Sequence, residues 1–460
     1  MTEIVVATRP TPGVPRPYAF PAFERSTLPN GLNLITVQLT GRPLVSASLV
    51  LRNGAADEPA AEGGSTVLAA RALAEGTERY DAIQLIEASE RLGAALHAEA
   101  NWDGMTAGVE VPAARLEPAL ELLAEMAGRP TFPEAEVERL RDERLNDILQ
   151  ARADPRRRVE EAFVETIYTE ASPYHRPSGG VRETVAPLTR TVLRGAWQRG
   201  MDPARTTLIV GGDVIGIDVP AIVEGLFGSW SAPDGVPPAG VIAADSAVHE
   251  RRVRLIHRPG AVQTEIRVGH VGVPRRIPDF HALSVMSTIL GGLFNSRLNM
   301  NLREEHGYTY GAGASFDLRR AAGPFAARAA VNTEVTVPAI REMVNELERI
   351  ATEPVTPAEL AAARDFLVGV FPLRFETPGP VVGSIAGIVI HGLPDDELAR
   401  YRDRVEAVTI EDVARVAGTH LHLDRAAIVL VGDADAVQSE VEAAAFGPVE
   451  RVEDELIPAG

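Results

Sequence analysis

The sequence predicts an α+β protein with two homologous domains, each a mostly antiparallel sheet covered by helices on one face, joined by a linker into a clamshell. The main observation is that the order of elements recurs along the chain with an offset of about 220 residues. Four landmarks carry the repeat: a strand, an early helix, the start of a long helix and a late strand. The first copies lie at 44–51, 64–75, 132–137 and 208–213, and the second copies at 264–268, 281–290, 356–360 and 427–433.

Hydrophobic periodicity, together with residues that begin or end helices, supports each element of the first copy. Alternating apolar residues predict strands at 44–51, 105–111 and 206–213. Helical segments are predicted at 63–75, 81–92, 116–126 and 134–152. Gly76 closes the first of these helices, and Pro133 opens the last one, which is rich in Glu and Arg.

Composition along the chain divides it into five parts. Residues 231–249 contain several Pro and Gly residues and little periodicity, which is typical of an interdomain linker. The proline-rich start predicts an extended arm. The predicted parts are an arm at 1–24, a first domain at 25–230, a linker at 231–249, a second domain at 250–446 and a C-terminal tail at 447–460.

Overall composition indicates a globular protein and excludes several function classes. The chain is 45% hydrophobic and 24% charged, and its net charge of −19 argues against nucleic acid or an anionic membrane as a partner. The absence of cysteine excludes disulfides and thiolate metal sites. The start lacks the pattern of a signal peptide, and no apolar run approaches the ~18 residues of a membrane span. We therefore expect a soluble, cytoplasmic protein.

One stretch combines a helix, a stop signal and a strand around residues suited to a functional site. Apolar positions predict a short helix over 296–306, and Gly307 stands where a C-terminal cap is expected. Period-two alternation predicts a strand over 308–312. Arg303 then lies in the last helical turn and Tyr310 lies in the strand, so that one tight turn brings the two side chains together.

Arg303 and Tyr310 together offer hydrogen-bond donors of the kind that hold a carbonyl oxygen or the oxyanion formed when it is attacked. A second interpretation stays open from the residues alone. Arg303 can be a solvated cation favoured by the helix C-terminus, and Tyr310 can be ordinary sheet packing.

Duplicated halves of this size, with the pattern Leu302-Arg303-Glu304 followed by Gly307 and Tyr310, resemble the pitrilysin or insulinase-type zinc peptidases. The likeness extends over 25–446 and is greatest to small bacterial members and to the subunits of the mitochondrial processing peptidase. It implies that Arg303 and Tyr310 reach a zinc site and bind the substrate near the scissile carbonyl. Tyr308 departs from the family pattern, which usually has a small apolar residue there.

The same resemblance implies an inverted zinc motif, H-x-x-E-H, on the first helix of the first half. Alignment on the helix end at Gly76 places the motif on 67–71, where Val67, Ala70 and Arg71 replace the two imidazoles and the catalytic base. The distal Glu falls near Asn146 or Asp147. We therefore expect no cofactor in this chain and zinc in a partner subunit.

The ten histidines provide no second copy of the motif. They are His97, His175, His249, His257, His270, His281, His306, His391, His420 and His422. Only His420 and His422 are close in sequence, on an expected extended segment without a useful Glu nearby. We interpret them as surface histidines.

The preferred hypothesis is a non-catalytic subunit of a heterodimeric zinc metallopeptidase that is inactive alone and contributes Arg303 and Tyr310 to the site of a homologous zinc-carrying subunit. A homodimer is expected where that partner is missing. The negative charge fits a chamber for basic peptide substrates. One alternative is a peptide-binding or scaffold protein of the same fold with no proteolytic role. Another is a stand-alone peptidase with a different metal site, which the lack of an H-x-x-E-H motif among the ten histidines disfavours.

Overall fold

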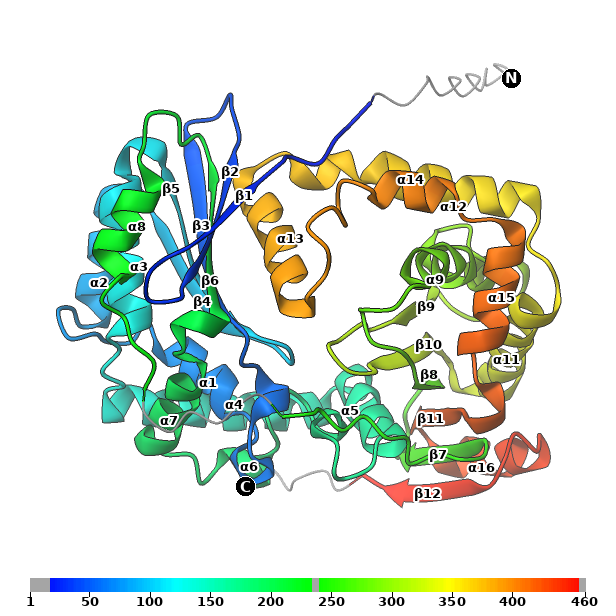
Figure 1. Cartoon of the computed structure of the whole chain (residues 1–460). Coiled ribbons are helices and arrows are strands. Elements are labelled where there is room, and N and C mark those ends of the chain that lie inside the picture. Colours follow the sequence, from blue (N-terminus) through cyan, green and yellow to red (C-terminus); the bar gives the residue numbers. More distant parts are fainter. Residues whose placement is uncertain (1–16, 234–239, 455–460) are drawn as a thin grey trace, which may run out of the picture.

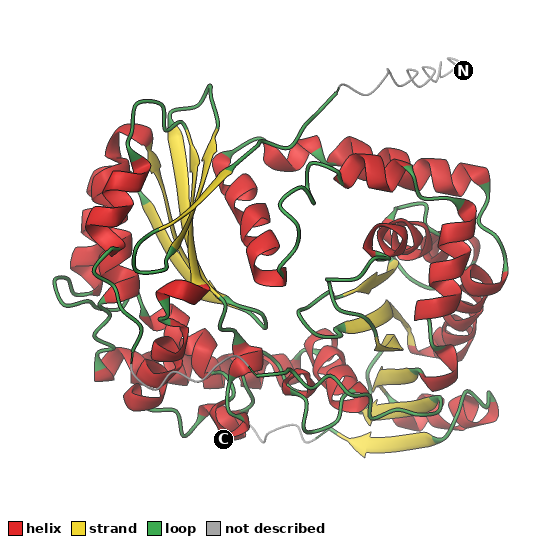
Figure 2. Cartoon of the chain, viewed as in Figure 1, coloured by secondary structure: helices red, strands yellow, loops and turns green. Residues whose placement is uncertain are grey.

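The computed structural model describes residues 17–233 and 240–454 and contains two six-stranded sheets, one in each half of the chain (Figures 1 and 2). The first sheet has the spatial order β1-β2-β6-β3-β5-β4, and the second has the order β12-β7-β11-β8-β10-β9. The strands of the first sheet are β1 (Glu24–Thr27), β2 (Asn33–Gln38), β3 (Leu44–Leu51), β4 (Ala95–Ala100), β5 (Met105–Pro112) and β6 (Thr206–Gly212). Those of the second are β7 (Arg252–His257), β8 (Gln263–Val271), β9 (Ala312–Phe316), β10 (Pro324–Asn332), β11 (Ala427–Gly432) and β12 (Val449–Glu453).

Five strands of one sheet correspond in order and direction to five strands of the other. The order β2-β6-β3-β5-β4 matches β7-β11-β8-β10-β9, and in both halves the first pair is parallel while the other three pairs are antiparallel. The sixth strand differs, since β1 pairs antiparallel with β2 whereas β12 pairs parallel with β7. The predicted fold class, two α+β halves with mostly antiparallel sheets, is confirmed. β12 lies in the segment predicted as a tail.

Sixteen α-helices accompany the sheets in the described part of the chain. Those of the first half are α1 (Ser65–Ala72), α2 (Ala82–Leu92), α3 (Leu116–Gly128), α4 (Glu134–Ala153), α5 (Pro155–Ile167), α6 (Arg182–Val185), α7 (Arg190–Gly200) and α8 (Val219–Phe227). Those of the second are α9 (Phe280–Ser287), α10 (Arg297–Asn299), α11 (Thr336–Thr352), α12 (Pro357–Val370), α13 (Pro378–His391), α14 (Tyr401–Glu406), α15 (Ile410–His420) and α16 (Ala434–Ala443). Local chemistry fixes their ends. Thr356 and Glu359 form a capping box at the start of α12, and Gly93, with φ 65°, ends α2.

Each sheet is also covered by a helix from the opposite half, which the sequence did not predict. α13 packs on β3 and β6, and its Val381, Val382 and Ile385 share a core with Ile209 of the first sheet. Conversely, α5 packs on β8 and β11 (Figure 1). The helices of each half cover one face of their own sheet, as predicted, and the exchanged helix covers the opposite face. The four apolar residues named are each buried, so the exchange joins the two halves through hydrophobic burial.

Two glycines allow this exchange because a side chain at either position would collide with the incoming helix. A Cβ on Gly211 of β6 would lie 2.7 Å from the Val382 side chain of α13. A Cβ on Gly269 of β8 would lie 2.9 Å from the Phe163 ring of α5. Glycine in a strand often marks such a close approach.

The segment before β1 also crosses to the second half. The Tyr18 ring stacks on Phe375 with centroids 6.2 Å apart, and Phe20 meets the same ring edge-on at 5.0 Å. Arg25 forms a bidentate pair with Asp395, at 2.6 and 2.8 Å. Of the predicted arm, linker and tail, residues 1–16, 234–239 and 455–460 lie outside the described residues. The described part of 231–249 contains only one isolated bridge, between Ser246 and Tyr168.

Equivalent hairpin turns of the two halves meet between the sheets. The turn after β9 carries Arg319, whose guanidinium lies 4.8 Å from the ring of Trp102 in the turn after β4. The next residue, Arg320, places Nη2 2.5 Å from Asp57 and donates its backbone N–H to Asp103 at 3.1 Å. These contacts hold the two halves in one arrangement. None of the helices in the described ranges has the length and apolar content that a membrane crossing requires.

Candidate functional site

The helix that carries Arg303 is shorter and less regular than predicted. α10 continues as a π-helical segment, Met300–Glu305, and Gly307 follows with φ 65°. Arg303 therefore lies in the last helical turn, as predicted, and Gly307 takes the left-handed conformation of a helix stop. Arg297, at the start of α10, holds the segment by a bidentate pair with Glu359, at 2.6 and 3.1 Å.

The segment that carries Tyr310 is a loop, so the predicted strand over 308–312 is wrong. Strand β9 begins only at Ala312. Thr309 explains the delay because its hydroxyl accepts from the Gly311 N–H and donates to the Ala330 carbonyl at 2.8 Å, in place of backbone pairing. Tyr308 is half-buried and stacks on His306, with centroids 4.9 Å apart. Tyr310 is 97% exposed, so the two tyrosines do not share a strand face.

Arg303 and Tyr310 make no hydrogen bond or ring contact with each other in the part of the chain that the structure describes. The Arg303 guanidinium lies 4.1 Å from the centroid of the Phe294 ring, and its Nε lies 3.3 Å from Glu304. Phe294 is itself 69% exposed, and Met300 is 45% exposed. Arg303 thus belongs to a partly apolar, outward surface, while Tyr310 projects freely.

Some of the positions that the resemblance assigned to the zinc motif line one cavity between the halves. Val67 and Arg71 of α1 line it, and so does Asp147 of α4, whereas Asn146 is exposed elsewhere on that helix. Ala70 is fully buried in the core of the first half. Arg71 donates to Glu143 at 2.8 Å. The helix face that resembles the zinc site of the family therefore presents an apolar side chain and a guanidinium.

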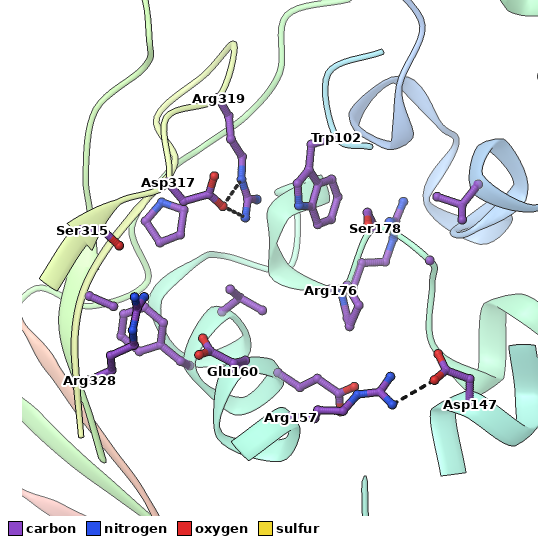
Figure 3. Close-up of a pocket in the computed structure, with 18 of the residues that line it drawn as sticks. Trp102, Asp147, Arg157, Glu160, Arg176, Ser178, Ser315, Asp317, Arg319 and Arg328 are labelled. Atoms are coloured by element: carbon purple, nitrogen blue, oxygen red, sulfur yellow. Dashed lines mark hydrogen bonds and ion pairs between the residues drawn. The ribbon is translucent and has the colours of Figure 1, made fainter. Parts of the chain in front are cut away.

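This cavity has a volume of about 610 Å³ and is lined by both halves (Figure 3). Six arginines and four acidic residues line it, which gives an excess of positive charge in an acidic protein. Figure 3 shows Arg319 and Trp102 along one side, Arg157 on the opposite side and Arg328 on a third. The sequence led us to expect an acidic chamber that suits basic peptides. The lining of this cavity is positively charged instead.

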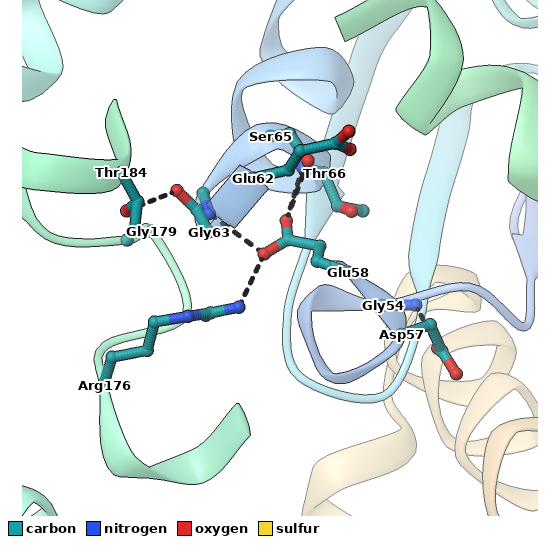
Figure 4. Close-up of polar contacts among 12 residues, drawn as sticks. Gly54, Asp57, Glu58, Glu62, Gly63, Ser65, Thr66, Arg176, Gly179 and Thr184 are labelled. Carbon is teal, nitrogen blue, oxygen red and sulfur yellow. Dashed lines mark hydrogen bonds and ion pairs between the residues drawn. The ribbon is translucent and has the colours of Figure 1, made fainter. Parts of the chain in front are cut away.

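A buried carboxylate fixes the start of α1 (Figure 4). The Glu58 side chain accepts from the backbone N–H groups of Gly64 and Thr66, at 2.9 and 2.6 Å, and from Arg176 at 3.1 Å. Burial raises the pKa of Glu58, and the charge of Arg176 opposes this rise. The carboxylate satisfies N–H groups that lack partners at a helix N-terminus. Sequence reasoning missed this residue because nothing in its local pattern separates it from a surface Glu.

One cluster of a histidine and two carboxylates could form another metal site. His257, Asp433 and Asp435 are the one His and carboxylate cluster in the described residues that is close enough to hold a metal. Its atoms are already engaged: the Ala434 N–H donates to His257 Nδ1 at 3.0 Å, and Arg451 donates to Asp435 at 2.8 Å. The cluster forms the start of α16 and lies away from the cavity.

The interpretation of His420 and His422 as surface residues on an extended segment is wrong. His420 ends α15 and lies 2.8 Å from Asp279, and both histidines are half-buried. The His422 N–H donates to Nε2 of buried His270 at 3.0 Å. Their packing against neighbouring elements gives them structural partners.

Sequence and structure comparisons agree with this architecture. The family model described as Insulinase (Peptidase family M16) matches residues 34–177, and the model described as Peptidase M16 inactive domain matches residues 187–367. Among solved structures, a peptidase M16 inactive domain from Pseudomonas fluorescens superposes with a TM-score of 0.83 at 24% identity and covers 89% of this chain and 98% of its own. The two halves thus form the paired α+β clamshell of this class. The chain belongs to the insulinase family, peptidase family M16, as a member that lacks the H-x-x-E-H motif of its catalytic relatives.

Curated relatives carry contrasting names. An uncharacterized zinc protease of Mycobacterium tuberculosis is 27% identical over 403 residues, which cover 87% of this chain and 91% of the relative. The Non-peptidase homolog YmxG of Helicobacter pylori is 20% identical over 399 residues, which cover 85% and 89%. A protease from Helicobacter pylori of known structure superposes with a TM-score of 0.82 at 20% identity and covers 89% and 99%.

Proposed function

We propose that this chain is the non-catalytic subunit of a heterodimeric zinc metallopeptidase and supplies Arg303 and Tyr310 to the zinc site of a homologous partner. In that site the two side chains bind the carbonyl of the scissile peptide bond. The chain is inactive alone, since its own α1 carries Val67, Ala70 and Arg71 at the motif positions.

The observation that carries the proposal is the exposure of Tyr310. Its side chain is 97% exposed, and its O–H has no hydrogen-bond partner in the described part of the chain. Neither Tyr310 nor Arg303 lines the cavity that contains Val67 and Arg71. Donors that face away from their own chamber are accessible to a second subunit, and the exposed rings of Phe294 and Tyr310 give a partner apolar surface to cover.

The role of the pair in the reaction is electrostatic. When water attacks a peptide carbonyl, negative charge develops on its oxygen, and preplaced donors stabilise this charge more than they stabilise the neutral carbonyl. Arg303 supplies a guanidinium and Tyr310 a phenolic O–H. The Phe294 ring beneath the guanidinium limits its motion, which reduces the entropy lost on binding.

The test is reconstitution with a zinc-carrying homologue encoded by the same organism, followed by measurement of peptide hydrolysis. Tyr310→Phe removes only the O–H, so we expect kcat to fall by roughly a hundredfold, equivalent to about 3 kcal/mol, with assembly and zinc content unchanged. Arg303→Ala should reduce kcat at least as much. Tyr308→Phe is the matched control, because Tyr308 lies two residues away and packs on His306.

Full activity of the Tyr310→Phe complex would exclude the donor role. Loss of the heterodimer in both variants would instead assign the pair to the interface. A chain that stays monomeric at micromolar concentration beside its homologue would contradict the subunit proposal, whereas self-association in the absence of that homologue is compatible with it.

A second candidate function is peptide binding by a scaffold protein that takes no part in proteolysis. Two observations favour it: a relative of similar length is named a non-peptidase homolog, and Val67 and Arg71 line the cavity between the halves at positions where the family resemblance implies zinc ligands. Peptide binding by the isolated chain, with no gain of hydrolysis on addition of any zinc-carrying homologue, would support this function over the first.

A further inference from the structure

We propose that the cavity between the two halves binds a carboxylate group of an acidic peptide. The inference concerns the chain by itself and does not rest on the proposed subunit role, since neither Arg303 nor Tyr310 lines this cavity. Three features of the lining support it: a cation and a buried guanidinium nitrogen that have no partner among the described residues, and apolar side chains in the wall.

The cation is Arg328 on β10. It stands directly opposite Arg267 of β8 in the antiparallel pair. Like charges at opposite positions of a sheet are destabilising. Arg267 is compensated, because Glu160 of α5 accepts from its Nε at 2.9 Å and lies 2.8 Å from its Nη2. Arg328 has no ion pair or hydrogen bond in the described ranges, so its charge faces the cavity without a counterion.

The second feature is Arg319, in the turn after β9. Its side chain is only 8% exposed and is held by Asp317 at 2.5 Å and by the rings of Trp102 and Tyr174. Its Nη1 is buried and has no hydrogen-bond partner among the described residues. A buried N–H without an acceptor costs about 1–3 kcal/mol, and an entering anion would remove that cost.

The other charged side chains around the cavity leave its net charge positive. Arg157 shares Asp147 with Arg144, so two guanidinium groups neutralise one carboxylate. Glu161 has no ion pair in the described part of the chain, and burial raises its pKa, which favours its neutral form. A modest positive excess interleaved with carboxylates suits a single negative charge, whereas a compact dianion such as phosphate would meet those carboxylates at close range.

Apolar side chains in the cavity wall indicate that the carboxylate belongs to a peptide. Phe163 and Val164 of α5, together with Trp102, line the cavity beside the arginines. A volume of about 610 Å³ accommodates a few residues, and it falls within the usual range of roughly 300–1,000 Å³ for ligand sites. Apolar walls bind the side chains that flank a charged group, and the guanidinium groups fix the position of that group.

The test measures binding of labelled hexapeptides to the full chain by fluorescence anisotropy. Three acetylated and amidated peptides alternate Ala with Glu, Gln or Lys, and a fourth contains only Ala and ends in a free carboxylate. We expect the Glu peptide to bind at least tenfold tighter than the Gln peptide and the Lys peptide to bind most weakly. Tight binding of the free-carboxylate peptide would identify the chain terminus as the recognised group, and tight binding of the Glu peptide would identify a side chain.

Arg328→Gln locates the site. Arg328 is exposed and has no partner among the residues that the structure describes, so the substitution leaves the fold intact, and we expect binding to weaken about tenfold. Arg341→Gln is the control, because Arg341 is an exposed arginine on the outer helix α11. A change in Trp102 fluorescence on binding, absent in Trp102→Phe, would confirm the location. Equal binding of the Glu and Lys peptides without tight binding of the free-carboxylate peptide, unchanged binding by Arg328→Gln, or full displacement by equimolar inorganic phosphate would each overturn the proposal.

Discussion

Replacement of Arg320 by Met tests whether the hairpin contact holds the two halves together. The Arg320 side chain is 14% exposed, and it faces Asp57 and Asp103, which are 10% and 9% exposed. The Nη2 atom lies 2.5 Å from Asp57, and Nε lies 3.5 Å from Asp103. Met keeps much of the volume but removes the charge, so two nearly buried carboxylates lose their common cation.

Burial sets the expected magnitude. Removal of one partner of a buried ion pair costs about 3–5 kcal/mol, because the other charge stays buried and uncompensated. Exposed pairs contribute about 0–1 kcal/mol, since water screens them. Arg400→Met is therefore a matched control: Arg400 pairs with Asp396 at 2.9 Å, but the two side chains are 64% and 45% exposed.

Urea denaturation followed by tryptophan fluorescence measures the difference. We expect Arg320→Met to lower the free energy of unfolding by about 3–5 kcal/mol and Arg400→Met to lower it by less than about 1 kcal/mol. Asp57→Asn in the Arg320→Met background should restore part of the loss, because it removes one orphaned charge. The reasoning would be refuted if Arg320→Met and Arg400→Met had equal effects, since water would then reach the carboxylates as readily as it reaches the surface pair.

Two further predictions concern metal and pH. Elemental analysis of the purified chain should find well below one equivalent of zinc, since Val67 and Arg71 offer no ligand, and one tightly bound zinc per chain would contradict this. Burial lowers the pKa of His270 to about 4, so the neutral ring contributes stability above its unfolded pKa of about 6.5 that is lost as the pH falls from 6.5 to 4. Denaturation midpoints across this window should fall less in His270→Gln than in the wild type, and parallel curves would exclude His270 as the cause.

Strands and capped helices could be predicted because their signals are local. The strand at 44–51 occupies the predicted residues, and the helix predicted at 81–92 is α2, preceded by Asp81 as its cap. The segment 308–312 also alternates, yet it forms a loop. There the Thr309 side chain donates to the Ala330 carbonyl in place of backbone strand pairing. Hydrophobic periodicity gives no sign of such a side-chain hydrogen bond.

The contacts between the halves could not be predicted from the sequence pattern. α13 is apolar on several faces, with Val381, Val382 and Ile388 all buried, which is typical of a helix covered on more than one side. The sequence did not reveal that the covering sheet belongs to the other half. Arg319 and Arg320 likewise have the composition of a solvated turn, and only the tertiary structure places Trp102 and Asp103 against them.

The exchanged helix α13 has a consequence during synthesis on the ribosome. The first sheet is complete once Gly212 has been made, whereas α13 ends only at His391. At about 5–20 residues per second, those roughly 180 residues leave one face of the sheet, including Ile209, bare for roughly 10–35 s. A nascent chain that stalls in this interval exposes a strand surface prone to aggregation. Its yield in cells should therefore depend on chaperones more than the yield of a protein in which each domain completes its core before the next is synthesised.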